Sequence, residues 1–174
     1  MIFTGFKRKS NQLFFNKRLP NLLENLPNKT SEKIKKVLVI LDNISEINNV
    51  KKNLSSTLKI SEKDIDLVIF QKKTTKNQEL EGLFSPKDIG WYGKIKSEEL
   101  KNILTKKYDL LINYNKVDNL YANIVLLHSK AVFKAGFSHL DNRLYDLLIK
   151  CKPDEITLFN NELKKYLTIL NKIK

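Results

Sequence analysis

Three short runs of apolar residues constrain the fold of this chain more than any other feature. The runs Val37–Leu41, Ile65–Phe70 and Tyr108–Asn113 are nearly continuous in hydrophobic side chains, many of them branched. A strand of this kind has to be covered on both faces, as happens in parallel sheets that are flanked by helices. We therefore expect the three runs to be central, adjacent and parallel strands of one sheet.

Segments with helical periodicity separate these runs. In the segment 44–58, for example, apolar residues recur at steps of three and four, which is typical of a helix that buries one side. Strands that alternate with helices of this length form βαβ units. With two further short strands, at Ala131–Phe137 and Tyr145–Ile149, the sequence predicts an α/β fold. We expect a mainly parallel, Rossmann-like sheet of about five strands with helices on both faces.

The length of 174 residues suits one domain with an appendage. We predict that residues 1–34 form a basic, amphipathic helical arm and that residues 35–174 form a single α/β domain. Apolar residues in the segment 2–26 have helical spacing, which one or two helices would satisfy. Pro20 is expected to begin the second of these helices, because proline suits a first turn.

The net charge of +13 suggests a nucleic-acid partner, but its composition weakens that inference. Lysines outnumber arginines by 29 to 3, and the arginine fork is the group that phosphate and base recognition favour. AT-rich codons can produce an excess of Lys, Asn and Ile without any partner. However, residues 1–36 alone carry +7 of the charge, and a codon bias that acts everywhere does not explain this concentration.

The arm is therefore the first candidate for a binding surface. Four of the nine phenylalanines lie in the first 15 residues. The basic residues beside them are Lys7, Arg8, Lys9, Lys17 and Arg18. A basic helix with an aromatic face can lie on an anionic membrane or dock on RNA. The alternative, which we favour, is a helix that packs its apolar face on its own domain and leaves a solvated basic back.

No catalytic motif is present. Neither glycine-rich phosphate loop follows a strand, and the segment after the first strand, residues 42–45, contains no glycine. His128, His139 and Cys151 lack the close spacing of metal ligands. We therefore name no catalytic residue, and we expect no bound metal and no cofactor.

Polar residues at the ends of the predicted strands form the second group of candidates. Asp42 and Asn113 end the first and third strands, where open α/β sheets bind ligands. Arg143 and Asp146 lie beside the last strand, and Arg143 is the only arginine after Arg18. These residues could hold a ligand. The interpretation that we favour is a loop with a satisfied ion pair, because structural pairs are common.

The only tryptophan, Trp91, lies between Gly90 and Gly93. An aromatic ring held between flexible points can serve as a platform for a base or a protein partner. It can equally anchor a loop by plugging the edge of the core. We favour the anchor, because large aromatic side chains are usually well buried.

Longer stretches of the chain resemble a known family. The sequences KKYDLLINYN, LLHSKAVFKAGF and YDLLIK, together with FSPKDIGWYGKI and the ending ELKKYLTILNKI, look like a family of uncharacterised proteins from Bacteroidota that is defined only as a domain of unknown function. This resemblance covers nearly the whole chain. It implies an α/β protein without an assigned activity.

Residues 107–137 also resemble, more weakly, the acceptor half of heptosyltransferase-type glycosyltransferases. The stretch YDLLINYN and the later LLHSKAVFKAGF follow the strand-helix-glycine pattern of those enzymes. The family holds its sugar nucleotide mainly with a second Rossmann-like domain, and this chain has room for one such domain.

These observations lead to two hypotheses about function. The first is a cytoplasmic, non-enzymatic binding module for an anionic partner: RNA, a ribonucleoprotein or the inner surface of a membrane. A single cysteine fits a reducing compartment, and no apolar run approaches the roughly 18 residues that span a bilayer. The alternative is a small or degenerate glycosyltransferase-like enzyme that acts on a phosphorylated ligand. A concave pocket that gathers Asp42, Asn113 and Arg143 would favour the enzyme, and a closed edge would favour the module.

Overall fold

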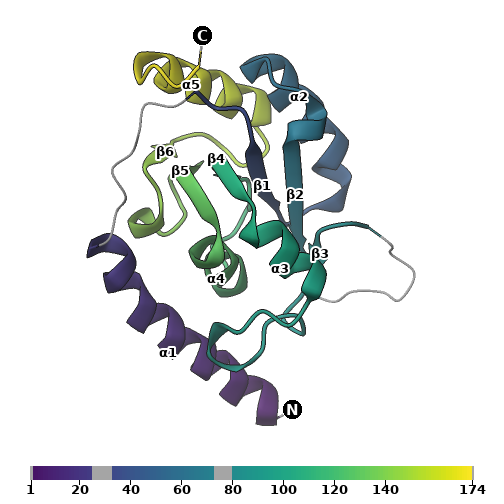
Figure 1. Cartoon of the computed structure of the whole chain (residues 1–174), viewed down its shortest axis with the longest axis vertical. Helices are drawn as coiled ribbons and strands as arrows, with labels where there is room; N and C mark the ends of the chain where they lie inside the picture. The colour runs from purple at the N-terminus through teal and green to yellow at the C-terminus, as the bar shows by residue number, and fades with distance from the viewer. Residues whose placement is uncertain (1, 25–32, 73–79, 174) are drawn as a thin grey trace.

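The computed structural model describes residues 2–24, 33–72 and 80–173. It shows a six-stranded, fully parallel sheet in the order β3-β2-β1-β4-β5-β6 (Figure 1). The strands are β1 Val37–Leu41, β2 Ile65–Phe70, β3 Leu83–Phe84, β4 Lys107–Asn113, β5 Lys130–Phe137 and β6 Leu147–Ile149. The α-helices are α1 Ile2–Glu24, α2 Ile47–Leu58, α3 Glu98–Thr105, α4 Leu120–His128 and α5 Ile156–Ile169. The short 3₁₀ helices are η1 Ile44–Glu46, η2 Glu62–Asp64, η3 Trp91–Gly93 and η4 Asn142–Leu144. The protein therefore has the α/β fold that the sequence predicts.

The three predicted central strands are confirmed. Strands β2, β1 and β4 are neighbours and run parallel, with Val37 paired to Ile65 on one side and to Leu110 on the other. All five residues of β1 are buried. Because side chains alternate along a strand, such a strand needs a hydrophobic layer on each side of the sheet.

Helices supply both layers. Helices α2 and α5 pack on the face that carries Val37 and Val39. Helices α3 and α4, together with α1, pack on the face that carries Leu38 and Ile40. Figure 1 shows α2 and α5 side by side, away from α1, α3 and α4. The result is a three-layer sandwich with the strand order of the doubly wound dinucleotide-binding folds.

The sheet has one strand more than the number of about five that we expect from the sequence. The additional strand, β3, has only two residues and pairs with the end of β2 through Ile69–Leu83 and Phe70–Phe84. An edge strand of two residues has no periodicity that a sequence pattern can reveal.

Helix α1 is one helix, and the expectation that Pro20 begins a second helix is wrong. Proline inside a helix removes one backbone hydrogen bond. Pro20 is exposed, so water can satisfy the carbonyl group that loses its donor. The preceding residue, Leu19, is buried against the domain and holds this part of α1 in place.

Helix α1 is docked on the loop that contains η3. Phe15 and Leu19 are buried in the same cluster as α3 and α4. The side-chain oxygen Oδ1 of the fully buried Asn11 accepts a hydrogen bond from the backbone N–H of Gly93 at 2.8 Å. Gly93 has a φ of 68°, and a Cβ atom there would lie 2.3 Å from the ring of Phe14. Only glycine fits at this contact. The side chain of Phe3 lies outside the part of the chain that the structure describes.

A polar contact on β2 makes stability depend on pH. The Oδ2 atom of Asp66 accepts hydrogen bonds from the hydroxyl of Tyr108 at 2.7 Å and from Nζ of Lys106 at 3.0 Å. Burial alone would raise the pKa of Asp66, but these hydrogen bonds outweigh burial and hold its pKa below the ordinary value. A carboxyl group whose pKa is lower in the folded state stabilises the fold above its unfolded pKa of about 3.9 and loses that effect as the pH falls.

We expect Asn11→Ala to lower the free energy of unfolding by about 1–3 kcal/mol, because the buried N–H of Gly93 loses its acceptor. Gln12→Ala is the matched control, since Gln12 is the next residue, is exposed, and donates a hydrogen bond to the exposed Asn16. It should change stability by less than about 0.5 kcal/mol. Urea unfolding followed by circular dichroism measures both, and equal losses would contradict the docking of α1 through Asn11.

We expect Asp66→Asn to lower stability by about 1 kcal/mol at pH 7, a modest effect because the carboxylate is partly exposed. The difference from the native protein should begin to shrink as the pH falls toward the unfolded pKa of about 3.9, and it should be lost once the pH lies below the lowered pKa of the native carboxylate. Urea unfolding at several pH values tests this, with Glu62→Gln as an exposed control. A difference that stays constant with pH would show that the charge of Asp66 is irrelevant.

Candidate functional site

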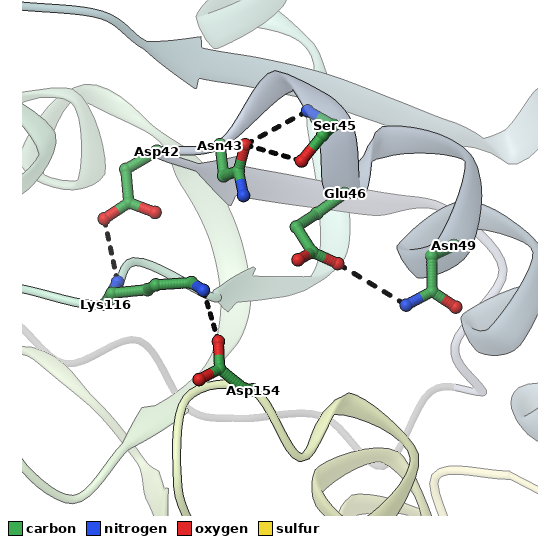
Figure 2. A network of polar contacts seen from close by, with 7 residues as sticks. All are labelled: Asp42, Asn43, Ser45, Glu46, Asn49, Lys116 and Asp154. Atoms are coloured by element: carbon green, nitrogen blue, oxygen red, sulfur yellow. Dashed lines mark hydrogen bonds and ion pairs between the residues drawn. The ribbon is translucent and has the colours of Figure 1, made fainter.

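The carboxyl ends of β1 and β4 meet where the strand order reverses, which is the usual ligand position in open α/β sheets. Here the polar groups bond to one another (Figure 2). Oδ2 of Asp42 accepts a hydrogen bond from the backbone N–H of Lys116 at 2.8 Å, and Nζ of Lys116 forms an ion pair with Asp154. Oδ1 of Asn43 accepts hydrogen bonds from the N–H and the hydroxyl of Ser45. The network ties the loops after β1 and β4 to the segment before α5.

A buried polar group lies behind this edge. Asn113, the last residue of β4, donates through Nδ2 to the hydroxyl of Tyr145 at 2.7 Å and accepts through Oδ1 from the N–H of Asn115 at 3.0 Å. Burial raises the pKa of the Tyr145 hydroxyl, which keeps it protonated. The side chain of Asn115 is 0% exposed, and neither of its amide atoms has a hydrogen-bond partner among the described residues. Buried amides of this kind are commonly satisfied by ordered water.

Arg143 and Asp146 have separate partners. Arg143 donates to both carboxylate oxygens of Asp141, at 2.8 and 2.6 Å, and these bonds hold the pKa of Asp141 below its ordinary value. Oδ2 of Asp146 accepts from the N–H of Lys134 at 2.9 Å. Both contacts are of the kind that shapes a loop. Among the described residues, the hydrogen-bond partner of the Arg143 side chain is Asp141 and that of the Asp42 carboxylate is Lys116, so these contacts do not join the two side chains.

A pocket of about 530 Å³ lies elsewhere on the same edge of the sheet. Its walls come from the first turns of α1, from the chain just after β2 and β3, and from the start of α4. The residues whose chemistry matters are Arg8, Phe70, Lys72, Asp118, Asn119 and Tyr121. We call it the edge pocket. The edge pocket is lined by none of the three residues Asp42, Asn113 and Arg143.

The edge pocket combines an aromatic wall with charged groups. The rings of Phe70 and Tyr121 are stacked, with centroids 6.1 Å apart and planes inclined by 10°. Burial raises the pKa of Tyr121, and the nearby Arg8 opposes that effect. Arg8 and Lys72 are exposed and form no ion pair within the described ranges. The pocket therefore presents two available cations next to a flat apolar surface.

A second surface lies on α1 and the η3 loop. Phe6, Leu13, Trp91 and Tyr92 are exposed by 59, 64, 46 and 68%. The hydroxyl of Ser10 accepts a hydrogen bond from the N–H of Tyr92 at 3.0 Å. Because Ser10 is four residues after Phe6 and three before Leu13, all three lie on one side of the helix. The tip of the η3 loop is thus beside this exposed apolar row.

Basic side chains accompany these exposed rings. Lys9, Lys17 and Arg18 are exposed on α1, and Lys94 is exposed on the loop. Lys7 instead turns inward, and its Nζ donates to the carbonyl oxygen of Pro86 at 2.7 Å. Burial and the charge of Lys96 lower the pKa of Lys7. We define the aromatic–basic surface as Phe6, Lys9, Leu13, Lys17, Trp91, Tyr92 and Lys94.

The structure changes the role that the sequence suggests for Trp91. Trp91 is not the loop anchor that we expect, because nearly half of its side chain is exposed. Phe14 occupies the anchoring position instead, against Gly93 and stacked on His128 with centroids 5.9 Å apart. Two aromatic side chains had escaped the sequence prediction. Tyr92 could have been found as the neighbour of Trp91, whereas Tyr121 carries no local signal.

Within the described residues we searched for a metal-binding group and for a helix that could span a membrane. They contain no group of three or more His, Cys, Asp and Glu side chains that could hold a metal ion. No helix in the described ranges has the length and apolarity that crossing a membrane requires. Burial raises the pKa of the Cys151 thiol, so the thiol is less nucleophilic at neutral pH than an exposed one.

Comparison with known proteins identifies the family alone. No curated protein and no solved structure matches the chain. The similarity to glycosyltransferases expected from residues 107–137 finds no support in these comparisons. The profile of one family does match, and it covers residues 7–170, which include most of α1, the η3 loop and the whole sheet. The chain therefore belongs to a family of unknown function, DUF6913.

Proposed function

We propose that this protein is a cytoplasmic, non-enzymatic binding module that holds single-stranded RNA on its aromatic–basic surface. The observation that carries the proposal is the pair of exposed rings, Trp91 and Tyr92, on a loop fixed to a basic helix. Bases stack on such rings with little regard to sequence, and neighbouring lysines attract the phosphates. RNA within a ribonucleoprotein would offer the same groups.

The backbone that carries Trp91 and Tyr92 is held in one conformation, which favours a role of these rings in binding over accidental exposure. Tyr92 has a φ of 51°, a conformation that non-glycine residues rarely adopt. The hydrogen bonds from Tyr92 to Ser10 and from Gly93 to Asn11 hold the backbone in this conformation. A ring on a fixed backbone loses less conformational entropy when it stacks on a partner. Strain of this kind is concentrated at functional sites.

The charge pattern favours RNA over a small acidic partner. Exposed Lys9 and Lys17 lie four residues before and after Leu13, along the same helix side. The row of charges therefore extends along the helix axis, as an extended phosphate backbone requires. An anionic bilayer is the competing partner for the same surface, since lysines beside exposed Phe6 and Leu13 also suit a lipid interface. The experiments below separate the two.

The first test removes the rings. Trp91→Ala with Tyr92→Ala should weaken the binding of an unstructured, fluorescein-labelled RNA by about 5- to 150-fold for each stacked base that is lost. Tyr166→Ala is the matched control, because Tyr166 is 45% exposed on α5, on the opposite side of the sheet. Fluorescence anisotropy measures the dissociation constants. Unchanged RNA binding by the double variant would contradict the proposal, as would binding to anionic vesicles without binding to RNA.

The second test concerns the lysines. Lys9→Gln with Lys17→Gln should make the plot of log affinity against log salt shallower by about 1.4 units, because each of the two phosphate contacts on a single strand contributes about 0.7. Lys52 and Lys63, exposed on α2 and η2, provide the control pair when changed to Gln. A slope that both pairs reduce equally would indicate a diffuse charge effect and would remove α1 from the interface.

A further inference from the structure

We propose that the edge pocket is a separate site for a small phosphate ester with a planar organic part, of about the size of a nucleoside monophosphate. The site goes beyond the proposed RNA surface. It lies on the other side of α1, because Arg8 follows Phe6 by two residues and such positions point in different directions on a helix.

The size and position of the edge pocket suit a small ligand. Its volume of about 530 Å³ lies within the usual range for small-molecule sites. Phe70 is the last residue of β2, and Asp118 and Asn119 precede α4. The pocket is therefore at the carboxyl edge of a parallel sheet, where open α/β folds bind their ligands. The first turns of α1 add a wall that the sheet alone would not provide.

Two positively charged side chains of the edge pocket would bind the phosphate group of such a ligand. The Arg8 guanidinium and the Lys72 ammonium both line it, and neither forms an ion pair with another described residue. Arginine matches the geometry of phosphate oxygens, and lysine adds a second charge. The start of α4 also lines the pocket through Asn119, Leu120 and Tyr121, and Oδ1 of Asn119 caps the helix by accepting a hydrogen bond from the N–H of Tyr121. These groups together favour a phosphate.

The remaining walls fit the organic part. Tyr121 and the mostly buried Phe70, whose rings are stacked on each other, give the wall an aromatic part against which a planar ring can pack. Asp118 provides a carboxylate that can accept hydrogen bonds from hydroxyl groups. Behind it, Nδ2 of the buried Asn123 donates to Asp118 at 3.1 Å, while Oδ1 of Asn123 has no partner among the described residues. Asn123 itself does not line the pocket, so its contribution is to hold the carboxylate of Asp118 in place.

The test uses adenosine monophosphate as the probe, titrated into the full chain by calorimetry. We expect Arg8→Gln with Lys72→Gln to weaken binding at least tenfold, which corresponds to the loss of a hydrogen bond to a charged group. Lys9→Gln is the matched control, because Lys9 is adjacent to Arg8 but does not line the pocket. Adenosine and ribose 5-phosphate should each bind more weakly than the complete nucleotide, since one lacks the phosphate and the other the planar ring.

Two results would overturn the proposal. One is the absence of adenosine monophosphate binding at millimolar concentration. The other is displacement of bound RNA by the nucleotide, which would make the pocket part of the RNA surface. Failure of the proposed RNA function is distinguishable, because the Arg8 and Lys72 variant would still lose nucleotide binding when no RNA binds. If both functions hold, that variant weakens RNA binding less than the change of Lys9 and Lys17 does.

Discussion

The burial of β1 and β4 on both faces is the constraint on which the rest of the structure depends. Every residue of β1 is at most 2% exposed, so each face of the strand requires a hydrophobic layer. Helices α2 and α5 supply one layer, and α3 and α4 supply the other. Parallel strands also bring all their carboxyl ends to one edge, and the loops that connect to the helices gather there. The polar network and the edge pocket are both consequences of this arrangement.

Helix α1 adds a second level of organisation to that sandwich. Phe15 and Leu19 of this helix are buried in the same cluster as α3, α4 and the residues Leu38 and Ile40 of β1. The contact depends on Gly93, whose missing side chain makes room for Phe14. One helix therefore fixes the η3 loop with one set of side chains and forms part of the wall of the edge pocket with Arg8. A change in the docking of α1 would affect the exposed rings and the pocket together.

The two proposed sites use the same kinds of group in different geometries. On the aromatic–basic surface, rings and lysines are exposed and spread along a helix, which suits an extended polymer. In the edge pocket, rings and cations surround a confined volume, which suits a small molecule. The switch point between β1 and β4 is different again, because Asp42 and Lys116 bond to neighbouring loops. The common ligand position of such folds is here used to hold the loops together.

The sequence by itself determined the architecture, because the runs at Val37–Leu41, Ile65–Phe70 and Tyr108–Asn113 cannot be covered in any other simple way. It also predicted helical structure in the basic N-terminal segment, where α1 lies, and it drew attention to the loop around Trp91. It could not determine the two-residue strand β3, whose pairing depends on the end of β2. Nor could it reveal that Trp91 is exposed while Phe14 is the anchor, since the choice depends on the conformation of Gly93. Only the tertiary structure brings Arg8, Lys72 and Tyr121 to one pocket, because they come from α1, the chain after β2, and α4, and no spacing in the sequence relates them.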